Sequence, residues 1–521
     1  MKKRIFALVA FGLCLIPVFF LIFSHYFQYH DGLIYTLNED GDSYSVVKGR
    51  SSLVHADIPP THKNKPVTAL RGNAFSSCDD LVSISVPPSV QKIEGRAFIG
   101  CKKFKSIYIS DLSAWCTVEI TSWLSTPREQ PLELYLHNEL VTDLTIPEGV
   151  TKIGDFTFAN MPNICNVKFP QGLVSIGEFA FSNCSSIPRF DLPESVSSLG
   201  MNAFSSCVSI TEFTLPAQIN TVPEDLLGGC SQLTTVLLHE SVTSIERGAF
   251  YGCEALTSIQ LPAELSSIGE LAFYFCTSLP DLTLPKGLQH IGKEAFRDCY
   301  RFEHVSLPTG ITTLERGVFE GCQNLKTVHL PEGLTEIHHY AFSDCYRLQD
   351  ISLPSGLDFL GANAFELKNL PLTVYENGLY LGNSENPYLV LMKMQDTTAT
   401  QFIFAPSAKF IHSNAFENAA LESLTVPHNI KFICRVAFNN CQKLKTVTFS
   451  AGVSCIEEGI FHRCGNLEEV HFSDPHNWWG YSHYYDMEKE AIPSEELADP
   501  KKNVKKLEFF EIHQYYKKIQ P

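Results

Sequence analysis

The sequence predicts a repeat solenoid, a fold in which similar coils stack and their short parallel strands line one face. Two observations predict it: one position, occupied by Phe in every copy except Leu227, recurs with a constant 23-residue period from Phe158 to Phe365, and apolar residues keep fixed offsets from it. A repeat of this length cannot bury its own apolar edge, so neighbouring repeats must cover one another. Fifteen repeats align on this position, at Phe75, Phe98, Phe158, Phe181, Phe204, Leu227, Phe250, Phe273, Phe296, Phe319, Phe342, Phe365, Phe416, Phe438 and Phe461.

The repeat that begins at Phe250 shows how one coil should fold. Ile259 and Leu261 alternate with Ser258 and Gln260, which predicts a short strand with one buried face. The proline that follows this strand cannot continue a ladder of hydrogen bonds and therefore ends it. The recurring Ala-Phe-x-x-Cys segment is too short for an independent helix, so we expect a single helical or 3₁₀ turn there.

The composition excludes several classes of protein. The 521 residues are 44% hydrophobic and 12% aromatic, which is too apolar for a disordered chain. The formal net charge is −17, and Lys and Arg cluster only at the extreme N-terminus and near residue 501. Because binding to phosphates needs a basic face, the composition argues against a nucleic-acid partner.

Residues 1–30 are predicted to form an N-terminal signal anchor. Lys2, Lys3 and Arg4 precede an uncharged apolar run from Ile5 to Phe23. As a helix this run would rise about 28 Å, close to the roughly 30 Å of the bilayer core. The run ends without the small residues of a signal-peptidase site, which favours a retained transmembrane helix over a cleaved signal and secretion. Basic residues before the span should keep the N-terminus cytoplasmic and residues 31–521 outside the cytoplasm.

Two hairpins are expected outside the regular repeats. In residues 31–72, Gly32–Tyr35 and Tyr44–Val47 should pair as an N-terminal cap that covers the open end of the solenoid. The repeats occupy residues 73–473 and are interrupted by insertions near 104–143 and 371–401. The second insertion should contain the other hairpin, which joins Gly378–Leu381 to Tyr388–Leu391.

The last segment, residues 474–521, no longer follows the repeat and is predicted to form a C-terminal cap or tail. Val504 to Ile519 could form a helix with Phe509, Ile512, Tyr516 and Ile519 on one side. The aromatic residues Trp478, Trp479, Tyr481, Tyr484 and Tyr485 could cover the last coil or stack on sugars, and covering the coil is the favoured interpretation.

The repeated pattern Cys-x-x-Leu-x-x-Ile-x-Leu-Pro-x-x-Leu-x-x-Ile-x-x-x-Ala-Phe-x-x-Cys resembles the BspA-like (treponemal-type) leucine-rich repeat family over about residues 31–475. The resemblance implies a leucine-rich-repeat horseshoe with a parallel β-sheet on its concave face and short 3₁₀ or helical turns elsewhere. It further implies a surface-exposed or secreted protein that serves adhesion and protein recognition, and it implies no catalytic residues.

Twelve of the seventeen cysteines occupy a single repeat position. Stacked coils would bring neighbouring cysteines to about 5 Å, within the Cα range of a disulfide, so a row of disulfides is one interpretation. The other is a column of buried thiols, which is favoured because Met161 and Ala419 occupy the same position and cannot form a bridge. The twelve are Cys78, Cys101, Cys184, Cys207, Cys230, Cys253, Cys276, Cys299, Cys322, Cys345, Cys441 and Cys464.

Motifs for catalysis or cofactor binding are not supported by the sequence. The stretch from Gly287 to Lys293 mimics the start of a phosphate-binding loop, but Glu294 stands where a Ser or Thr is required. The sequence has no Cys-x-x-Cys pair, no G-x-S-x-G and no H-E-x-x-H motif. We therefore predict a non-enzyme with no catalytic, cofactor or metal site.

The solvent-facing side chains of the predicted strands form the candidate binding surface. They are mostly polar, with many Ser and Thr residues, which predicts a broad contact surface rather than a deep pocket. Asp281, His304, His329 and Asp350 could alternatively hold a metal or act as acid and base, although scattered surface residues of these types are usually only solvated. The candidate residues are Arg189, Asp191, Glu212, Asp281, His304, His329 and Asp350.

Together these features predict a membrane-anchored, non-catalytic cell-surface protein for recognition or adhesion, whose ligand is an unidentified extracellular protein or glycan. Two alternatives stay open. The first is a carbohydrate-active or metal-dependent enzyme on the same scaffold, and the second is a passive spacer in the cell envelope.

Overall fold

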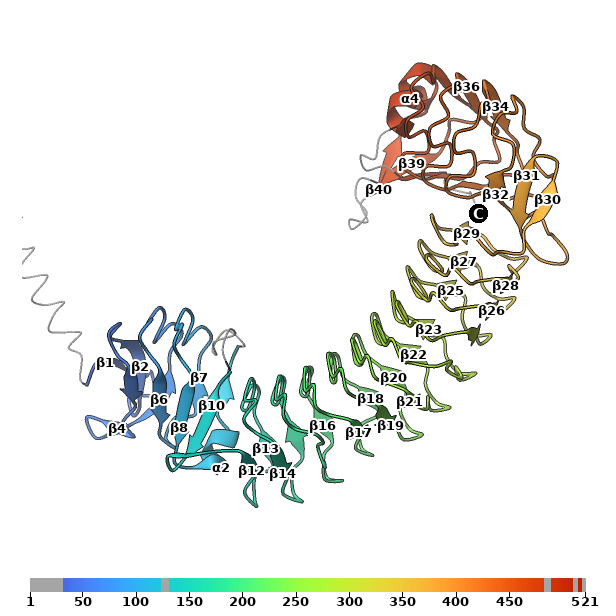
Figure 1. The fold of residues 1–521 in the computed structure, drawn as a ribbon. Helices are drawn as coiled ribbons and strands as arrows, with labels where there is room; N and C mark the ends of the chain where they lie inside the picture. The colour runs from blue at the N-terminus through green and yellow to red at the C-terminus, as the bar shows by residue number, and fades with distance from the viewer. Residues whose placement is uncertain (1–30, 123–130, 482–488, 509–513, 518–521) are drawn as a thin grey trace, which may run out of the picture. The chain divides into compact units, whose positions relative to one another are not determined.

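The computed structural model describes residues 31–122, 131–481, 489–508 and 514–517. The chain divides into two units (Figure 1): unit 1 extends to Ile219 and includes Pro223–Leu233, and unit 2 comprises Asn220–Val222 and the chain from Thr234 onwards. The predicted signal anchor lies outside the described residues. Within the described part, no helix is long and apolar enough to cross a membrane.

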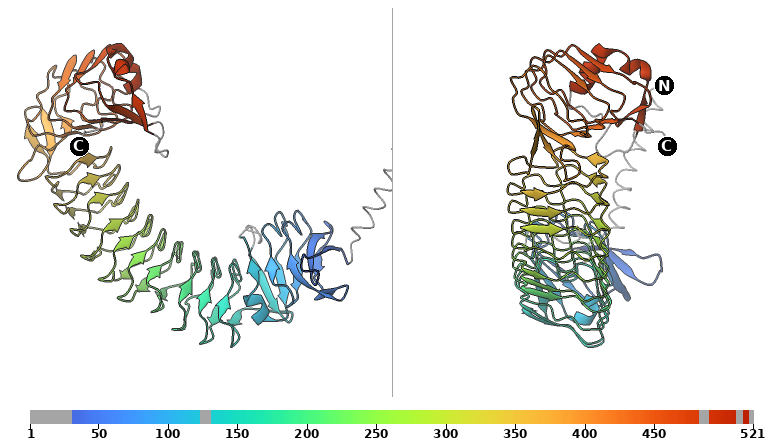
Figure 2. Two further views of the ribbon diagram at one scale, coloured as in Figure 1. Left: turned by 180° about the vertical axis from the view of Figure 1, so that it is seen from behind. Right: turned by 90° about the vertical axis from the view of Figure 1, so that its right-hand side faces the viewer.

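Each regular coil contributes to two parallel ladders, both visible in the two views of Figure 2. The first ladder contains the predicted strand before the proline. In unit 1 its strands are β3 (His55–Asp57), β6 (Ser83–Val86), β8 (Ser106–Ile109), β10 (Glu133–Leu136), β12 (Asp143–Thr145), β14 (Asn166–Lys168) and β17 (Glu212–Thr214). In unit 2 they are β19 (Thr235–Leu237), β21 (Ser258–Ile259), β24 (His304–Ser306), β26 (Thr327–His329), β28 (Asp350–Ile351), β34 (Ser423–Val426), β36 (Thr446–Phe449) and β38 (Glu469–Phe472).

The second ladder runs through the Leu-x-x-Ile part of each repeat and was not predicted, because its strands are mostly two residues long and show no alternation. In unit 1 they are β5 (Lys65–Leu70), β7 (Lys92–Ile93), β9 (Glu119–Ile120), β13 (Lys152–Ile153), β15 (Ser175–Ile176) and β16 (Ser198–Leu199). In unit 2 they are β18 (Thr221–Val222), β20 (Ser244–Ile245), β22 (Ser267–Ile268), β23 (His290–Ile291), β25 (Thr313–Leu314), β27 (Glu336–Ile337), β29 (Phe359–Leu360), β33 (Phe410–Ile411), β35 (Phe432–Ile433) and β37 (Cys455–Ile456).

The Ala-Phe-x-x-Cys segment forms a hydrogen-bonded turn rather than the helical or 3₁₀ turn that was expected. Its closing hydrogen bond runs from the Cys253 N–H to the Phe250 carbonyl at 3.1 Å, and Gly252 takes a positive φ of 66° directly before the cysteine. The turn also bonds to the next coil, since the Phe250 N–H donates to the Ala272 carbonyl at 2.9 Å. Consecutive coils are thus joined by backbone hydrogen bonds along a third row besides the two ladders.

The recurring phenylalanines form stacked columns inside each unit. In unit 2, Phe273 and Phe296 have ring centroids 5.4 Å apart at an interplanar angle of 8°, and Phe296 stacks on Phe319 at 5.6 Å and 5°. In unit 1, Phe158 and Phe181 stack at 5.2 Å. All five side chains are fully buried. The periodicity therefore predicted the core correctly.

The repeat cysteines are buried free thiols, which confirms the favoured interpretation over a row of disulfides. Most of these thiols donate to the carbonyl of the phenylalanine one coil back, as Cys276 does to Phe250 at 3.1 Å and Cys184 does to Phe158 at 3.1 Å. Burial raises the pKa of Cys184 to about 12. The column thus satisfies a row of buried carbonyls while it fills the core.

The predicted N-terminal hairpin is formed by β1 (Leu33–Leu37) and β2 (Tyr44–Gly49), and β2 pairs in parallel with β5. The second predicted hairpin is formed by β31 (Gly378–Leu381) and β32 (Val390–Met394), with β30 (Thr373–Tyr375) along its outer edge. Because β32 pairs with β33, this hairpin covers the first of the C-terminal coils. Both hairpins therefore protect strand edges, as an open solenoid end requires.

Within the predicted insertion 104–143, β8 and β10 continue the first ladder, and Ser106 is the register partner of Glu133. The connection between these strands is longer than in a regular coil and contains helix α2 (Leu112–Cys116), capped by the Asp111 carboxylate. Trp115 of this helix is buried, and its Nε1–H donates to the Thr157 carbonyl at 3.1 Å. The insertion is thus an enlarged coil, and Trp123 lies outside the described residues.

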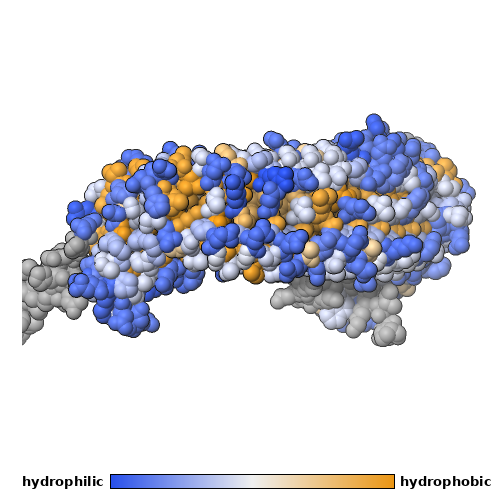
Figure 3. Space-filling view, turned by 90° about the horizontal axis from the view of Figure 1, so that it is seen from below, coloured by the Kyte–Doolittle hydropathy of each residue, from blue (hydrophilic) through white to orange (hydrophobic). Residues whose placement is uncertain are grey.

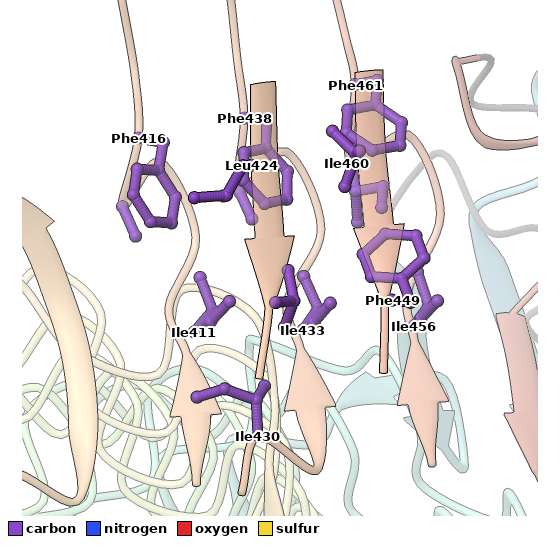
Figure 4. Close-up of a cluster of buried hydrophobic side chains, with 14 of the residues drawn as sticks. Ile411, Phe416, Leu424, Ile430, Ile433, Phe438, Phe449, Ile456, Ile460 and Phe461 are labelled. Carbon is purple, nitrogen blue, oxygen red and sulfur yellow. The ribbon is translucent and has the colours of Figure 1, made fainter. Parts of the chain in front are cut away.

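The C-terminal coils of unit 2 pack their second ladder against an earlier part of the same unit. His339 Nε2 lies 2.7 Å from Glu457 Oε1, and both side chains are almost fully buried. The second Glu457 oxygen accepts from the Arg435 N–H at 2.7 Å, and Phe359 meets Phe432 edge-on at 4.9 Å. Figure 4 shows the apolar core of these coils, with Phe416, Phe438 and Phe461 in register.

The predicted helix from Val504 to Ile519 is present as far as Glu508 and is wrong at Gln514–Lys517. Helix α4 covers Pro500–Glu508 after the short α3 (Ser494–Leu497), whereas Gln514–Lys517 forms strand β41. β41 pairs antiparallel with both β37 and β39 (Trp478–Tyr481), and β39 pairs with β40 (Lys489–Ile492). The unpaired edge of β37 selects a strand here, because it offers backbone hydrogen bonds that local helix propensity cannot outweigh. Phe509, Ile512 and Ile519 lie outside the described residues.

We expect Phe296→Ala to lower the free energy of unfolding of the full chain by about 3–5 kcal/mol, since it removes a ring buried between two others and leaves a cavity. Urea denaturation followed by circular dichroism measures this change. Tyr346→Ala, at a residue that is 43% exposed, is the control and should change stability by no more than about 0.5 kcal/mol. Equal effects of the two substitutions would contradict the stacked core.

The thiols should differ sharply in reactivity, because only the thiolate is alkylated and burial holds the repeat cysteines protonated. In the folded chain at pH 8, iodoacetamide should modify the exposed Cys165 and leave Cys184 and Cys276 unmodified until urea is added. Mass spectrometry of tryptic peptides gives the readout. Modification of Cys276 at the rate of Cys165 in the folded chain would show that the column is open to solvent.

Candidate functional site

The solvent-facing residues of the first ladder form what we call the strand face. Strand β24 is representative: Val305 is buried, whereas His304 and Ser306 on either side of it are exposed. Because the strands are parallel and in register, equivalent residues of successive coils line up in columns. His304, Thr327 and Asp350 form one such column, and Ser306 and His329 belong to the next.

The three predicted site residues of unit 1 are exposed. Arg189 and Asp191 pair with each other, and the Arg189 Nε–H donates to Asp191 Oδ1 at 2.8 Å. Glu212 lies on β17 beside the buried Phe213. Residues 189–191 themselves form no strand, because Pro188 has no N–H with which to bond the preceding coil.

In unit 2, the structure does not bring Asp281, His304, His329 and Asp350 together. Thr327 separates His304 from Asp350 in their column, and His329 lies in the other column. In the described ranges, no group of three or more His, Cys, Asp or Glu side chains is placed to hold a metal ion. The alternative that these four residues together hold a metal ion therefore has no geometric support.

Asp281 instead takes part in an interruption of the first ladder. Pro280 occupies the position at which equivalent residues, such as Lys326, donate an N–H to the preceding coil. Residues 281–283 accordingly form no strand, and β21 is not paired with them. The Asp281 carboxylate replaces the backbone acceptor of this coil, since its Oδ1 accepts from the Glu303 N–H at 2.7 Å and the His304 N–H at 3.0 Å.

The interruption leaves an open groove of about 690 Å³ on the strand face of unit 2. Ile259 and Leu282 are only partly buried beside it, whereas the equivalent Val305 and Val328 of regular coils are buried. The lining is mixed: Glu240, Ile259, Gln260, Leu261, Ala263, Asp281, Leu282, Thr283, Pro285 and Lys286. The feature of the sequence that could have predicted this groove is Pro280, which stands where most other repeats have a residue with a backbone N–H donor.

The strand face of unit 1 also carries aromatic residues that the sequence analysis missed. Tyr108 on β8 and Tyr135 on β10 are register partners, and their rings stack with centroids 4.6 Å apart. His55 of β3 lies edge-on to Tyr108 at 5.9 Å and holds Ser83 and Ser85 through its two ring nitrogens. The pairing of Tyr108 with Tyr135 was not recognised in the sequence, because residues 104–143 depart from the regular repeat spacing.

Of the C-terminal aromatic residues, Trp478 is buried and Trp479 is partly buried. Trp478 is 2% exposed, packs edge-on against Phe472 at 5.2 Å and donates its Nε1–H to the Asp474 carbonyl. It therefore covers the last first-ladder strand rather than offering a platform for sugars. Tyr484 and Tyr485 lie outside the described residues. Elsewhere, hydrophobic residues reach the surface between polar ones, as on the face drawn in Figure 3.

This architecture of short, regularly repeated coils with two parallel ladders is that of a leucine-rich repeat protein. The sequence profile of the BspA type leucine-rich repeat region matches residues 51–116, 133–257, 243–371 and 395–492. These segments cover well over half of the chain, so the protein belongs to the BspA-type leucine-rich repeat family. No curated protein shows significant sequence similarity to it.

Several solved structures are similar to the chain. A leucine-rich repeat protein from Bacteroides ovatus is 21% identical, with 85% of this chain and 94% of that chain covered and a TM-score of 0.43. A leucine-rich cell surface protein from Faecalibacterium prausnitzii is 21% identical, with 86% and 94% covered and a TM-score of 0.37. The leucine-rich repeat protein of T. pallidum is also 21% identical, with 53% and 90% covered and a TM-score of 0.22.

We expect Asp281→Ala to speed amide hydrogen exchange at Glu303 and His304 by about tenfold, because both N–H groups lose a charged acceptor worth about 1.5 kcal/mol. Hydrogen exchange with mass spectrometry measures the effect. Asp350→Ala is the matched control, since this carboxylate is exposed on the same face and accepts no bond from the backbone of the described residues. Unchanged exchange in the Asp281 variant would show that the carboxylate does not hold this coil.

Proposed function

We propose that the protein is a non-catalytic cell-surface recognition protein, whose strand face binds an extracellular protein or glycan. The observation that carries this proposal is the strand face itself. It presents regular columns of exposed polar side chains on hydrogen-bonded ladders, such as His304, Thr327 and Asp350, so that the contact residues are held in fixed positions.

Membership of the BspA-type family supports the proposal, because such solenoids expose long surfaces for binding. The basic residues Lys2, Lys3 and Arg4 and the apolar run to Phe23 support a single-pass anchor with residues 31–521 outside the cytoplasm. Secretion after cleavage of that segment is the alternative. An acidic chain of net charge −17 is poorly suited to nucleic acid.

The full-length chain in detergent micelles, tested against arrays of extracellular proteins and glycans, should show saturable binding to at least one of them. His304→Glu and Asp350→Lys, both in unit 2, should each weaken that binding in a graded manner, by about 2- to 10-fold, as expected for rim charges of a broad interface. His290→Glu, an exposed residue of the second ladder, is the control and should leave the affinity unchanged.

The outcome also separates the alternative functions. An enzyme would lose turnover of a substrate abruptly on one substitution, whereas a recognition surface loses affinity in steps. Absence of any saturable partner across the arrays would count against the proposal and favour a passive spacer in the envelope.

A further inference from the structure

The aromatic cluster on the strand face of unit 1 has the composition of a contact site. Tyr108 and Tyr135 are both only partly buried, and their rings lie nearly parallel at 16°. Two tyrosines on adjacent strands supply a large amphipathic surface with few rotatable bonds, which is the kind of residue that dominates protein interfaces. Leu140, opposite Tyr135 on the neighbouring β11 (Glu139–Leu140), is 40% exposed and extends this surface.

Two carboxylates, Glu133 and Asp57, lie on the strands around the tyrosines. The Tyr135 hydroxyl donates to Glu133 Oε2 at 3.0 Å, and Lys105 pairs with the other oxygen of Glu133 at 2.7 Å. Asp57 lies in the same column as Tyr108, with Ser85 between them, and is exposed. Asp57 forms no ion pair with any described residue. The faces of aromatic rings and a free carboxylate both favour a cation.

Unit 2 contains the same combination in a completed form. Tyr251 and Tyr274 stack at 5.2 Å and 11°, and the Arg297 guanidinium lies 5.7 Å from the Tyr274 ring. Glu294 and Glu320 pair with that guanidinium at 3.1 and 3.3 Å. A stacked tyrosine pair flanked by carboxylates thus receives an arginine within this chain, whereas no described arginine lies over Tyr108 or Tyr135.

We propose that Tyr108 and Tyr135 form a docking site for an arginine side chain of a protein partner. The guanidinium packs against the tyrosine rings and directs its N–H donors toward Asp57 and the Ser85 hydroxyl. Arginine fits better than lysine, because its planar group stacks on rings and bonds a carboxylate through two donors. This inference rests on the proposed recognition function and specifies the chemistry of the partner.

The test uses the full-length chain in detergent micelles as the target for a phage-displayed library of random peptides. Enriched peptides should share an arginine, and synthetic copies should bind saturably. Replacing that arginine by the uncharged isostere citrulline should abolish binding, and lysine should weaken it. Tyr108→Ala and Tyr135→Ala should each weaken binding by about 5- to 30-fold, the range of a cation–π contact.

The control variant is Tyr251→Ala, which removes a ring from the stacked pair of unit 2 and should leave peptide affinity unchanged. Tyr135→Phe keeps the ring and should retain most of the affinity, which distinguishes a lost contact from a misfolded variant. Enrichment of peptides without a basic residue, or equal binding to Tyr108→Ala and the unmodified chain, would overturn this inference. Neither result bears on saturable binding in the array experiment, so the proposed function would stand or fall separately.

Discussion

Every other feature of this protein depends on the contact between consecutive coils. A single coil has almost no interior, and its phenylalanine is buried only because equivalent rings lie above and below it. The Phe250 N–H bonds to Ala272 of the next coil, and the Cys276 thiol bonds back to Phe250. Stability is therefore added coil by coil between neighbours, as expected for a quasi-one-dimensional fold.

Departures from this regular contact create the distinctive surfaces. Pro280 removes one N–H donor from the first ladder, and the Asp281 side chain compensates for the next coil but not for the preceding one. The groove therefore lies between this coil and the preceding one, whereas the next coil, with β24, is hydrogen-bonded to the Asp281 carboxylate. The Tyr108–Tyr135 pair likewise lies on the enlarged coil of unit 1. In a repeat protein, functional features are expected at the coils that depart from the repeat pattern.

The sequence was sufficient for features set by one coil and its neighbours. The phenylalanine columns, the buried thiols, the first ladder and both hairpins follow from periodicity and turn residues, and all are present. The second ladder was missed because two-residue strands carry no alternation. The contact of His339 with Glu457 joins residues more than one hundred positions apart, and no local pattern signals such a pair. The predicted helix 504–519 is wrong at Gln514–Lys517, because the free strand edge of β37 offers backbone hydrogen bonds that local helix propensity cannot outweigh.

The candidate surface was predicted in part. The exposed polar columns were placed correctly by period-2 alternation, and Glu212, His304, His329 and Asp350 lie on that face. Whether Asp281, His304, His329 and Asp350 lie close enough to form one site could not be predicted, because spacing along the chain does not give the distances between their side chains. Tyr108 and Tyr135 went unnoticed because the enlarged coil between them breaks the regular spacing by which register partners are recognised.

The constant register between Phe273, Phe296 and Phe319 also bears on how such chains change over generations. An in-frame duplication or loss of one coil leaves every remaining ring with a partner above and below. Gene recombination can therefore lengthen or shorten the stack of coils in steps of about 4.8 Å. The side chains and hydrogen bonds of the remaining coils are unchanged by such an event.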